Sequence, residues 1–287
     1  MVHVARQAGA KGRVTHWGLI PSEGEFLSSL ARVAKEKSLT QANCIAMLIP
    51  GEYHIMAVEA PNVPREELRS AIRWKVKDLL EYHVDDATID VLEIPGDQAP
   101  DGKARLMYAV ATRNDLVKKR IADFQEARLQ LKVIDIPEMA QRNIASRFET
   151  ADRSIALVSF REWGGLLTFT HQGELLLSRR LEVTSEQLAM PDHRAHYLER
   201  VTTDLQRSFE NFERRFHRSP IAELLVAPLP DEEALTGHLA ANLYLPVKAV
   251  QLEELLEFPS GHAPTVQEQS QYFHLFGAAL REEVRAL

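Results

Sequence analysis

The chain has 287 residues, of which 45% are hydrophobic and 26% charged, so it can form one large folded domain or two ordinary ones. Its net charge of −7 argues against a general nucleic-acid-binding protein, which needs a basic face to contact phosphates. The single cysteine, Cys44, excludes an intrachain disulfide and a cysteine-rich metal site, and no apolar run approaches the ~20 residues that span a bilayer.

The first part of the chain alternates strand and helix patterns, which is typical of an α/β fold. The predicted strands cover residues 1–6, 13–20, 42–49, 53–59, 88–94, 106–111 and 131–136. The predicted helices cover residues 25–37, 64–79, 114–129 and 137–148. The unbroken apolar run at 42–49 favours a strand covered on both faces. The polar segment 96–103, which contains Pro and Gly, predicts a loop.

The helix predicted at 64–79 has a distinctive surface. Pro64 stands at the first helical position, and two glutamates follow in the first turn, where carboxylates suit the helix dipole. Its apolar stripe consists of Leu68, Ala71, Ile72, Val76 and Leu79. Trp74 falls on the opposite side at about 100° per residue. We therefore predict that a second surface covers Trp74, either another subdomain or another protein.

The second part of the chain begins with an antiparallel meander after a boundary at 149–153. Its predicted strands cover residues 154–160, 166–171, 174–181, 221–227 and 247–250, with turns at 163–165 and 172–173. Its predicted helices cover residues 195–218 and 231–243, and a closing helix follows from residue 271. The segments 183–194 and 258–270 are predicted to be irregular. Both halves share a weak pattern of strands, a long helix, then strand and helix.

Two motifs carry a family resemblance. The order of an apolar strand, a Pro, a helix reading EELRSAIRWKVKDLL, an acidic break and a strand reading TIDVLEI resembles the type IV pilus assembly protein PilM. More narrowly it resembles the PilM relative MshI of mannose-sensitive haemagglutinin (MSHA) pili. The closing segment YFHLFGAALRE is similar to the last helix of that family. The resemblance covers most of the chain in element order.

The resemblance implies an actin-like α/β fold, with two similar lobes around a nucleotide cleft. The first lobe would span residues 1–153 and carry a small inserted α/β module at about 61–130. The second lobe would span residues 154–270. The closing helix, 271–287, would return to the first lobe.

The resemblance also implies where nucleotide chemistry should lie, and this chain departs from the pattern there. Each lobe should begin with a hairpin turn that carries an acidic residue and glycines, which hold phosphates and organise Mg²⁺. The first lobe has no Asp or Glu before Glu23. In the second lobe, Ser159 and Arg161 stand near the places of the acidic residue and the first glycine, and Gly164 and Gly165 remain as a turn.

A third departure follows the strand at 221–227. The Ser-Gly-Gly-type turn that should approach the adenosine is replaced by a segment with Pro228 and Pro230, which lack an N–H group. We therefore expect a degenerate nucleotide site, no catalytic residues, and neither ATP nor Mg²⁺ as a cofactor. Without the acidic metal partners, phosphoryl transfer would lose its electrostatic stabilisation.

The partner implied by the resemblance is the short N-terminal cytoplasmic peptide of a PilN-like single-span inner-membrane protein, alongside other components of the pilus machine. The chain would then be a cytoplasmic scaffold, peripheral to the inner membrane through its partners. The peptide groove would involve the strand 53–59 and parts of residues 66–81. The expected contact residues are Tyr53, Ile55, Arg69, Arg73 and Trp74. Alternatively, Trp74 packs inside the protein between module and lobe.

Several other readings stay open. The chain could be an active nucleotide-binding actin-like ATPase of pilus or type II secretion assembly, with Glu162 or Asp135 as the acidic residue. It is also similar in kind to the cytoplasmic part of the type II secretion L protein. No sequence motif supports an unrelated α/β enzyme, because neither a GxSxG nor a Walker motif occurs. His193 and His196 with Asp192 make either a metal site or a solvated loop.

Overall fold

A computed structural model describes residues 1–6, 11–20, 26–37, 39, 42–95, 105–150 and 152–282. The chain divides into two compact units. The first unit joins Met1–Gly18 to Pro137–Arg281, and the second consists of Leu19–Ile136 and also takes Glu282. The predicted lobe boundaries stay a prediction. The loop predicted at 96–103 lies outside the described residues.

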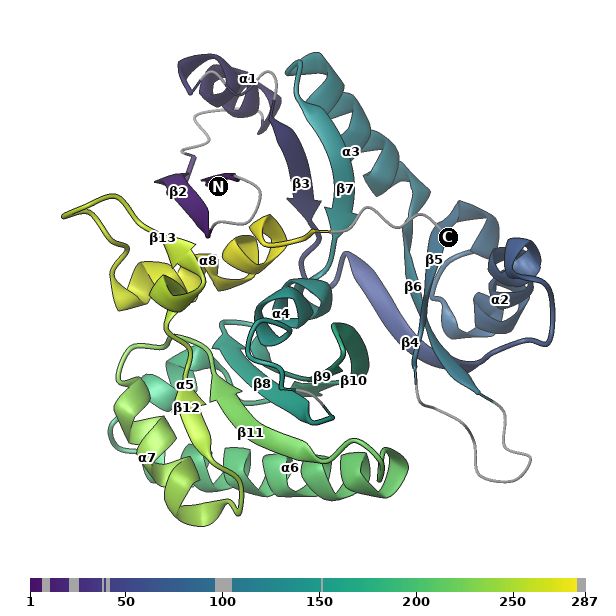
Figure 1. Cartoon of the computed structure of the whole chain (residues 1–287). Helices are drawn as coiled ribbons and strands as arrows, with labels where there is room; N and C mark the ends of the chain where they lie inside the picture. The colour runs from purple at the N-terminus through teal and green to yellow at the C-terminus, as the bar shows by residue number, and fades with distance from the viewer. Residues whose placement is uncertain are drawn as a thin grey trace. The chain divides into compact units, whose positions relative to one another are not determined.

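The first unit is built on a five-stranded mixed sheet in the order β10-β9-β8-β11-β12 (Figure 1). Its strands are β8 (Ser154–Arg161), β9 (Gly164–His171), β10 (Glu174–Leu181), β11 (Ile221–Val226) and β12 (Val247–Ala249). The predicted meander β8-β9-β10 is antiparallel and is confirmed, and β11 pairs in parallel with both β8 and β12. All residues of β8 and β9 except the last of each are buried, because helices cover both faces of this sheet.

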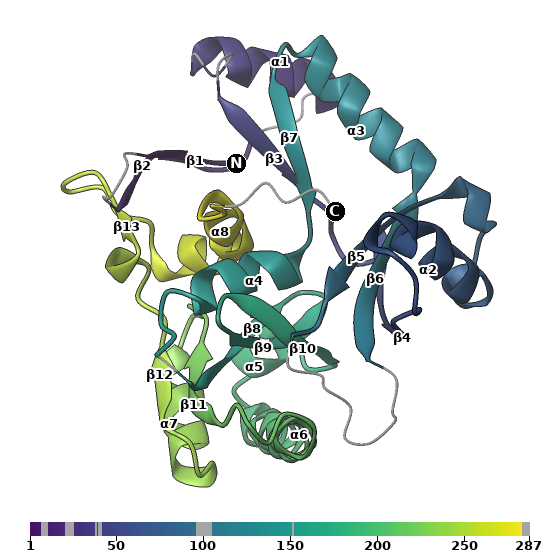
Figure 2. The same cartoon turned by 45° about the vertical axis from the view of Figure 1, so that its right-hand side comes forward.

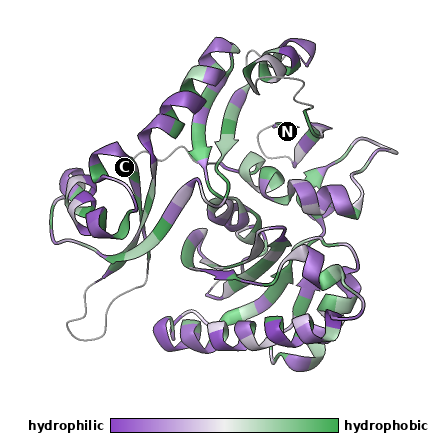
Figure 3. Ribbon diagram, turned by 180° about the vertical axis from the view of Figure 1, so that it is seen from behind, coloured by the Kyte–Doolittle hydropathy of each residue, from purple (hydrophilic) through white to green (hydrophobic). Residues whose placement is uncertain are grey.

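Helices cover the two faces of this sheet from opposite sides, as Figure 2 shows with the long helix seen end-on. The helices are α4 (Pro137–Ala145), α5 (Ser185–Ala189), α6 (Arg194–Arg215), α7 (Glu232–Asn242) and α8 (Val266–Ala279). From α6, Phe209 and Phe212 pack against Phe169 of β9 with ring centroids 6.0 and 4.3 Å apart. On the other face, α4 packs against β8, β9 and β10. Figure 3 shows the resulting contrast between largely hydrophobic strands and a largely hydrophilic α6.

The first unit also holds a small sheet made from both ends of the chain, in the order β1-β2-β13. Its strands are β1 (Val2–Ala5), β2 (Gly12–Trp17) and β13 (Leu256–Glu257), the last of which follows a 3-10 turn at Leu252–Glu254. Trp17 of β2 connects this sheet to the segment that follows β13. Its indole N–H donates to Glu268 over 3.3 Å, and its ring lies 4.8 Å from that of His262. The strand predicted at 1–6 is confirmed, and the strand predicted at 13–20 is shorter, since it ends at Trp17.

The second unit contains two sheets. A parallel pair joins β3 (Asn43–Met47) to β7 (Gln130–Asp135), with α1 (Phe26–Glu36) and α3 (Asn114–Glu126) packed nearby. The other sheet has the antiparallel order β4-β6-β5, from β4 (Tyr53–Glu59), β6 (Leu106–Arg113) and β5 (Ala87–Glu93). The helix α2 (Leu68–Val76) covers one face of it, and its buried residues join Val58, Val91, Met107 and Ala109 in one core.

The structure corrects several predictions in this unit. The helix predicted at 64–79 is α-helical over Leu68–Val76, with 3-10 turns at Arg65–Glu67 and Lys77–Leu79. A 3-10 turn advances by about 120° per residue, so Leu79 leaves the apolar stripe and is 56% exposed. Within the described residues, β3 pairs with β7 alone, and Ile49 just after it is 59% exposed, so the run 42–49 is not covered throughout.

Two irregular predictions in the first unit were wrong because capping boxes were missed. The segment 183–194 contains α5, whose Thr184 side chain accepts from the backbone N–H of Gln187 while Gln187 reaches back to Thr184. The segment 258–270 ends in the first turn of α8, where Thr265 and Glu268 form the same reciprocal pair. A Thr followed three residues later by Gln or Glu is a readable helix start. The turn predicted at 163–165 is shorter, since Gly164 and Gly165 belong to β9.

Candidate functional site

The predicted phosphate-side position in the first unit is filled by a buried hydrogen-bonded cluster. Ser159 of β8 is 2% exposed, and its hydroxyl donates to Oε1 of Gln141 over 2.7 Å. Nε2 of His274 on α8 lies 3.3 Å from that hydroxyl and 3.2 Å from the same Gln141 oxygen. The Gln141 amide nitrogen donates in turn to Leu157 O and to Thr168 Oγ1, each over 3.0 Å. The Ser159 side chain therefore faces protein groups.

His274 is the titratable member of this cluster. Burial, reinforced by the positive charges of Arg161 and Arg180, lowers the pKa of His274 to about 3, so its ring is neutral at physiological pH. The indole of Trp163 stacks on the imidazole with centroids 6.1 Å apart, and the Arg180 guanidinium lies 5.1 Å from the Trp163 ring. A neutral ring suits this place, because a buried imidazolium would need a charged partner.

The other predicted nucleotide-loop residues also have roles inside the unit. Arg161 donates to the carbonyl oxygen of Ser270 and pairs with Glu162 over 3.4 Å. A Cβ on Gly164, at φ +116°, would come 2.6 Å from Leu181 O, and one on Gly165 would come 2.9 Å from the Phe160 ring. Both glycines thus serve close packing between strands.

The structure also shows where three further predicted residues lie, namely the proline of the adenosine turn and the two alternative acidic residues. Pro228 is buried just after β11, beside Ala227, whose N–H donates to Val158 O over 2.9 Å. Glu162 is the exposed partner of Arg161, as described above. Asp135 is buried in the second unit, where its Oδ1 accepts from the backbone N–H of Ile136 over 2.9 Å.

The predicted partner-binding residues lie in the second unit, but in two separate places. Tyr53 and Ile55 lie on β4, where alternate side chains point to opposite faces. Because Met56 and Val58 pack under α2, Tyr53 and Ile55 occupy the face away from α2. Arg69, Arg73 and Trp74 are on α2 itself. The structure does not bring the two groups together.

The three predicted residues on α2 differ in what they can offer a partner. Arg69 pairs with Asp90 of β5 over 3.0 Å. Arg73 donates to Ala87 O over 3.2 Å and pairs with Asp85 over 3.5 Å. Trp74 is 72% exposed, with the Lys77 ammonium 5.8 Å from its ring centroid. Trp74 therefore presents its side chain to solvent, whereas the two arginines hold α2 to its own sheet.

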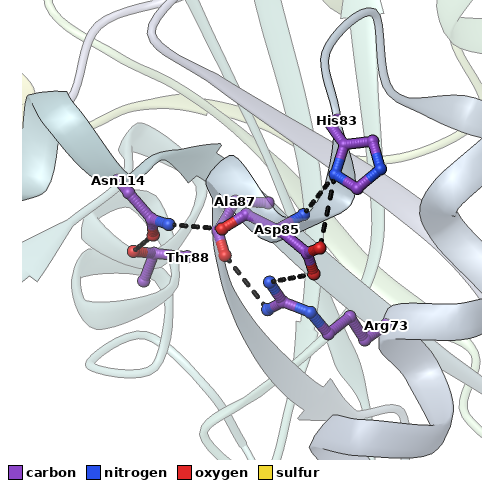
Figure 4. Close-up of polar contacts among 6 residues, drawn as sticks. All are labelled: Arg73, His83, Asp85, Ala87, Thr88 and Asn114. Atoms are coloured by element: carbon purple, nitrogen blue, oxygen red, sulfur yellow. Dashed lines mark hydrogen bonds and ion pairs between the residues drawn. The ribbon is translucent and has the colours of Figure 1, made fainter.

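A polar network fixes the segment that links α2 to β5. Figure 4 draws its members, which are Arg73, His83, Asp85, Ala87, Thr88 and Asn114. The Asn114 amide donates to Asp85 O over 2.8 Å, and the Thr88 hydroxyl donates to Asn114 Oδ1 over 2.7 Å. The backbone N–H of Asp85 donates to Nδ1 of His83 over 3.3 Å. The network joins this segment to the N-terminus of α3.

A pocket of about 570 Å³ opens beside this network, and sequence reasoning missed it. Its lining includes Glu52, His54, Glu81, Tyr82, Arg113 and Asp115. These residues come from the start of β4, the segment after α2 and the junction of β6 with α3. No single motif could reveal it, because its walls are far apart in the sequence. Across the described residues, no group of three or more His, Cys, Asp or Glu side chains could hold a metal ion.

Comparison with known proteins adds the family. A family model described as type IV pilus assembly protein PilM matches residues 20–211. The chain belongs to the PilM family. The family match covers both the module with its pocket and the meander with Ser159. The comparison with curated proteins gave no match. No helix among the described residues is long and apolar enough to cross a membrane.

One solved structure shows the fold of this PilM-family chain. It is similar to a chain of the PilM-PilN type IV pilus biogenesis complex, with TM-score 0.64 and 19% identity over 97% of this chain and 92% of that one. It is also similar to the cytoplasmic domain of EpsL, an inner-membrane component of the type II secretion system of Vibrio cholerae, with TM-score 0.48 and 13% identity over 95% and 87%. The predicted actin-like α/β fold is confirmed.

Proposed function

We propose that this PilM-family chain is a non-catalytic scaffold of a type IV pilus assembly machine. In this proposal its degenerate nucleotide site binds no ATP, and its second unit docks onto the cytoplasmic tail of a PilN-like single-span inner-membrane protein. That contact would hold it at the cytoplasmic side of the inner membrane and bring it together with other components of the pilus machine. The two sequence motifs favour the MSHA-type branch, represented by MshI, within the family.

The main support for a non-catalytic role is the hydrogen bonding of Ser159. In this proposal Ser159 replaces the acidic residue of the second hairpin, and a hydroxyl cannot supply the charge that organises Mg²⁺. Its hydroxyl donates one hydrogen bond to Gln141 and lies 3.3 Å from Nε2 of His274, so protein groups fill the space beside it. Arg161, two residues on, donates to Ser270 O, where the fold would use a glycine N–H toward phosphate.

The docking part is supported by the surface of the second unit. Trp74 is an exposed aromatic anchor on a helix held in place by Arg69 and Arg73. Aromatic side chains on a rigid support commonly dominate interface energies. The solved relative in the PilM-PilN complex assembles with PilN, and a similar tail is the partner we propose here.

The first test is a calorimetric titration of the full chain with ATP and ADP in the presence of Mg²⁺, with a thermal-unfolding series alongside. We expect no binding heat and no shift of the unfolding midpoint at millimolar nucleotide. A nucleotide that bound the folded state would raise that midpoint. Micromolar binding would overturn the proposal in favour of an active actin-like ATPase. A second titration uses the N-terminal cytoplasmic peptide of the PilN-like protein, for which we expect saturable binding.

A further inference from the structure

The strand β3 of the second unit is paired along one edge only. It runs parallel to β7 over Asn43–Met47, and within the described residues no other strand pairs with it. The irregularity in this ladder falls on β7, where the register passes from Leu131 to Val133, so β3 itself is regular. The backbone N–H and C=O groups on its other edge are therefore open to pairing with a further strand.

The composition of β3 differs from that of the other edge strands. Charged side chains on an edge strand keep further strands away, and an uncharged edge lacks this protection. Every other edge strand that the structure describes holds a histidine or a formally charged residue, namely His3 in β1, Glu59 in β4, Asp90 in β5, Lys132 in β7, Arg180 in β10, Lys248 in β12 and Glu257 in β13. The sequence of β3, NCIAM, holds none. Its open edge therefore has nothing to repel another uncharged strand.

The apolar side chains at β3 are incompletely covered. Ile45 and Met47 are half-buried, and Ile49, just beyond the strand, is 59% exposed. A further strand along this edge would pack against these side chains and would give the open N–H and C=O groups partners. The open edge and the exposed apolar surface therefore fit the same kind of occupant, an extended and uncharged segment.

We infer that β3 pairs with β3 of a second copy of this chain, antiparallel to it, about a two-fold axis beside Ile45. Among the described edge strands, β3 is the one that can approach β3 without bringing a charged or titratable side chain to the contact. In this arrangement Ile45 of one copy lies opposite Ile45 of the other, and Cys44 lies opposite Ala46. The two-fold axis closes the contact, so two chains associate and no open β3 edge remains.

The contact is weak because the strand is short. Five residues a side bury far less than the ~1,200 Å² at which stable interfaces begin, so we expect association at high micromolar protein concentration. The contact is separate from the docking proposed above, because β3 belongs to a different sheet from the β4-β6-β5 sheet that α2 covers. If the proposed function holds, such a pair of scaffolds presents two docking surfaces for tail peptides.

Sedimentation equilibrium of the full chain, from low to high micromolar concentration, tests the pairing. We expect the average mass to rise with concentration from that of one chain towards that of two. Ile45→Lys should keep the chain monomeric, because it places two ammonium groups directly opposite each other. Leu131→Lys, which introduces the same charge at a half-buried position of β7, is the control and should associate like the native chain. Thermal unfolding of both variants checks that each is folded.

Two measurements on the native chain need no substitution. Cys44 is the single cysteine and lies on β3, so a short bis-maleimide cross-linker should join two chains through it. The backbone amides of β3 should also exchange with solvent about threefold more slowly at high than at low protein concentration, because pairing protects them.

The outcomes separate this inference from the proposed function. A chain that stays monomeric at every concentration, or equal association of the native chain and Ile45→Lys, would overturn the pairing. Slow amide exchange of β3 in a monomeric chain would mean that the chain itself covers this edge, which overturns the pairing as well. The PilN-like tail peptide should bind the native chain and Ile45→Lys with the same affinity. Self-association without any binding of that peptide would leave the pairing intact and remove the proposed function.

Discussion

The side-chain amide of Asn114 donates a hydrogen bond of 2.8 Å to the carbonyl oxygen of Asp85, and so joins two segments that are far apart in the sequence. Asn114 stands between Arg113 and Asp115 on one wall of the pocket, and Asp85 follows Tyr82 on the other. The bond adds a side-chain link to the backbone pairing of β5 with β6, in which Ala87 lies opposite Arg113 (Figure 4).

Asn114→Ala should lower the free energy of unfolding by about 1 kcal/mol, because it removes the bonds to Asp85 and Thr88 at a partly exposed site. Urea unfolding measures this effect. Lys118→Ala, at an exposed position of the same helix, is the control and should leave the free energy of unfolding unchanged. Equal unfolding free energies for the two variants would contradict a stabilising role of the Asn114 bonds.

Gly277→Ala should destabilise the first unit by about 1–3 kcal/mol through overpacking. A Cβ at this position of α8 would lie 2.3 Å from Ala140 O on α4, and the Asn143 amide that donates to Gly277 O over 3.0 Å would be displaced. Gly237→Ala is the matched control, because a Cβ there meets nothing within 4 Å. Since Ala favours helix over Gly, that variant should gain up to about 1 kcal/mol. Both variants are measured by thermal and urea unfolding. Equal changes in the free energy of unfolding for Gly277→Ala and Gly237→Ala would contradict the packing argument.

His274 should make stability depend on pH on the acid side of neutrality. Its pKa is about 3 in the folded chain, lowered by burial and by Arg161 and Arg180, against 6.5 in its ordinary state. Between these values the unfolded chain binds a proton that the folded chain does not, so stability is complete above about pH 6.5 and falls below it. The slope is about 1.4 kcal/mol per pH unit at most. Carboxylates titrate in part of the same range, so the comparison must be between variants.

The check is the free energy of unfolding from pH 7.5 to 4.5 for the native chain and His274→Gln. The variant should lose the His274 part of the slope while losing some stability at pH 7.5, because its contacts to Ser159 and Gln141 change. His217→Gln, at an exposed position after α6, should keep the native slope. Parallel curves for the native chain and His274→Gln would mean that the buried ring does not resist protonation.

Trp74→Ala should leave stability within about 0.5 kcal/mol of the native value, because the indole is 72% exposed. The same change should weaken binding of the PilN-like tail peptide if Trp74 anchors it. Ile72→Ala, two residues earlier on α2, should cost about 2–5 kcal/mol, because Ile72 is fully buried under the sheet. Chemical unfolding and a peptide titration on both variants distinguish an interface residue from a core residue. A large stability loss in Trp74→Ala would identify it as a packing residue instead.

Much of the secondary structure could be read from local pattern. Three closely spaced strand segments with turns at 163–165 and 172–173 predicted the meander β8-β9-β10, and the regular spacing of Leu198, Val201, Leu205 and Phe209 predicted α6, because each pattern is decided by neighbours along the chain. Where reading failed, as at α5 and the start of α8, the missed signal was still local, a Thr with Gln or Glu three residues on.

The sequence by itself determined the family and the α/β actin-like fold, because these depend on which residues occur in which order along the chain. The tertiary structure alone decided what each polar side chain bonds to. It bonded Arg69 and Arg73 to residues of β5 and the segment before it, left Trp74 exposed, and brought the Arg113 guanidinium to the Tyr82 ring. Side-chain partners come from segments that folding brings together, and no spacing along the chain encodes that proximity.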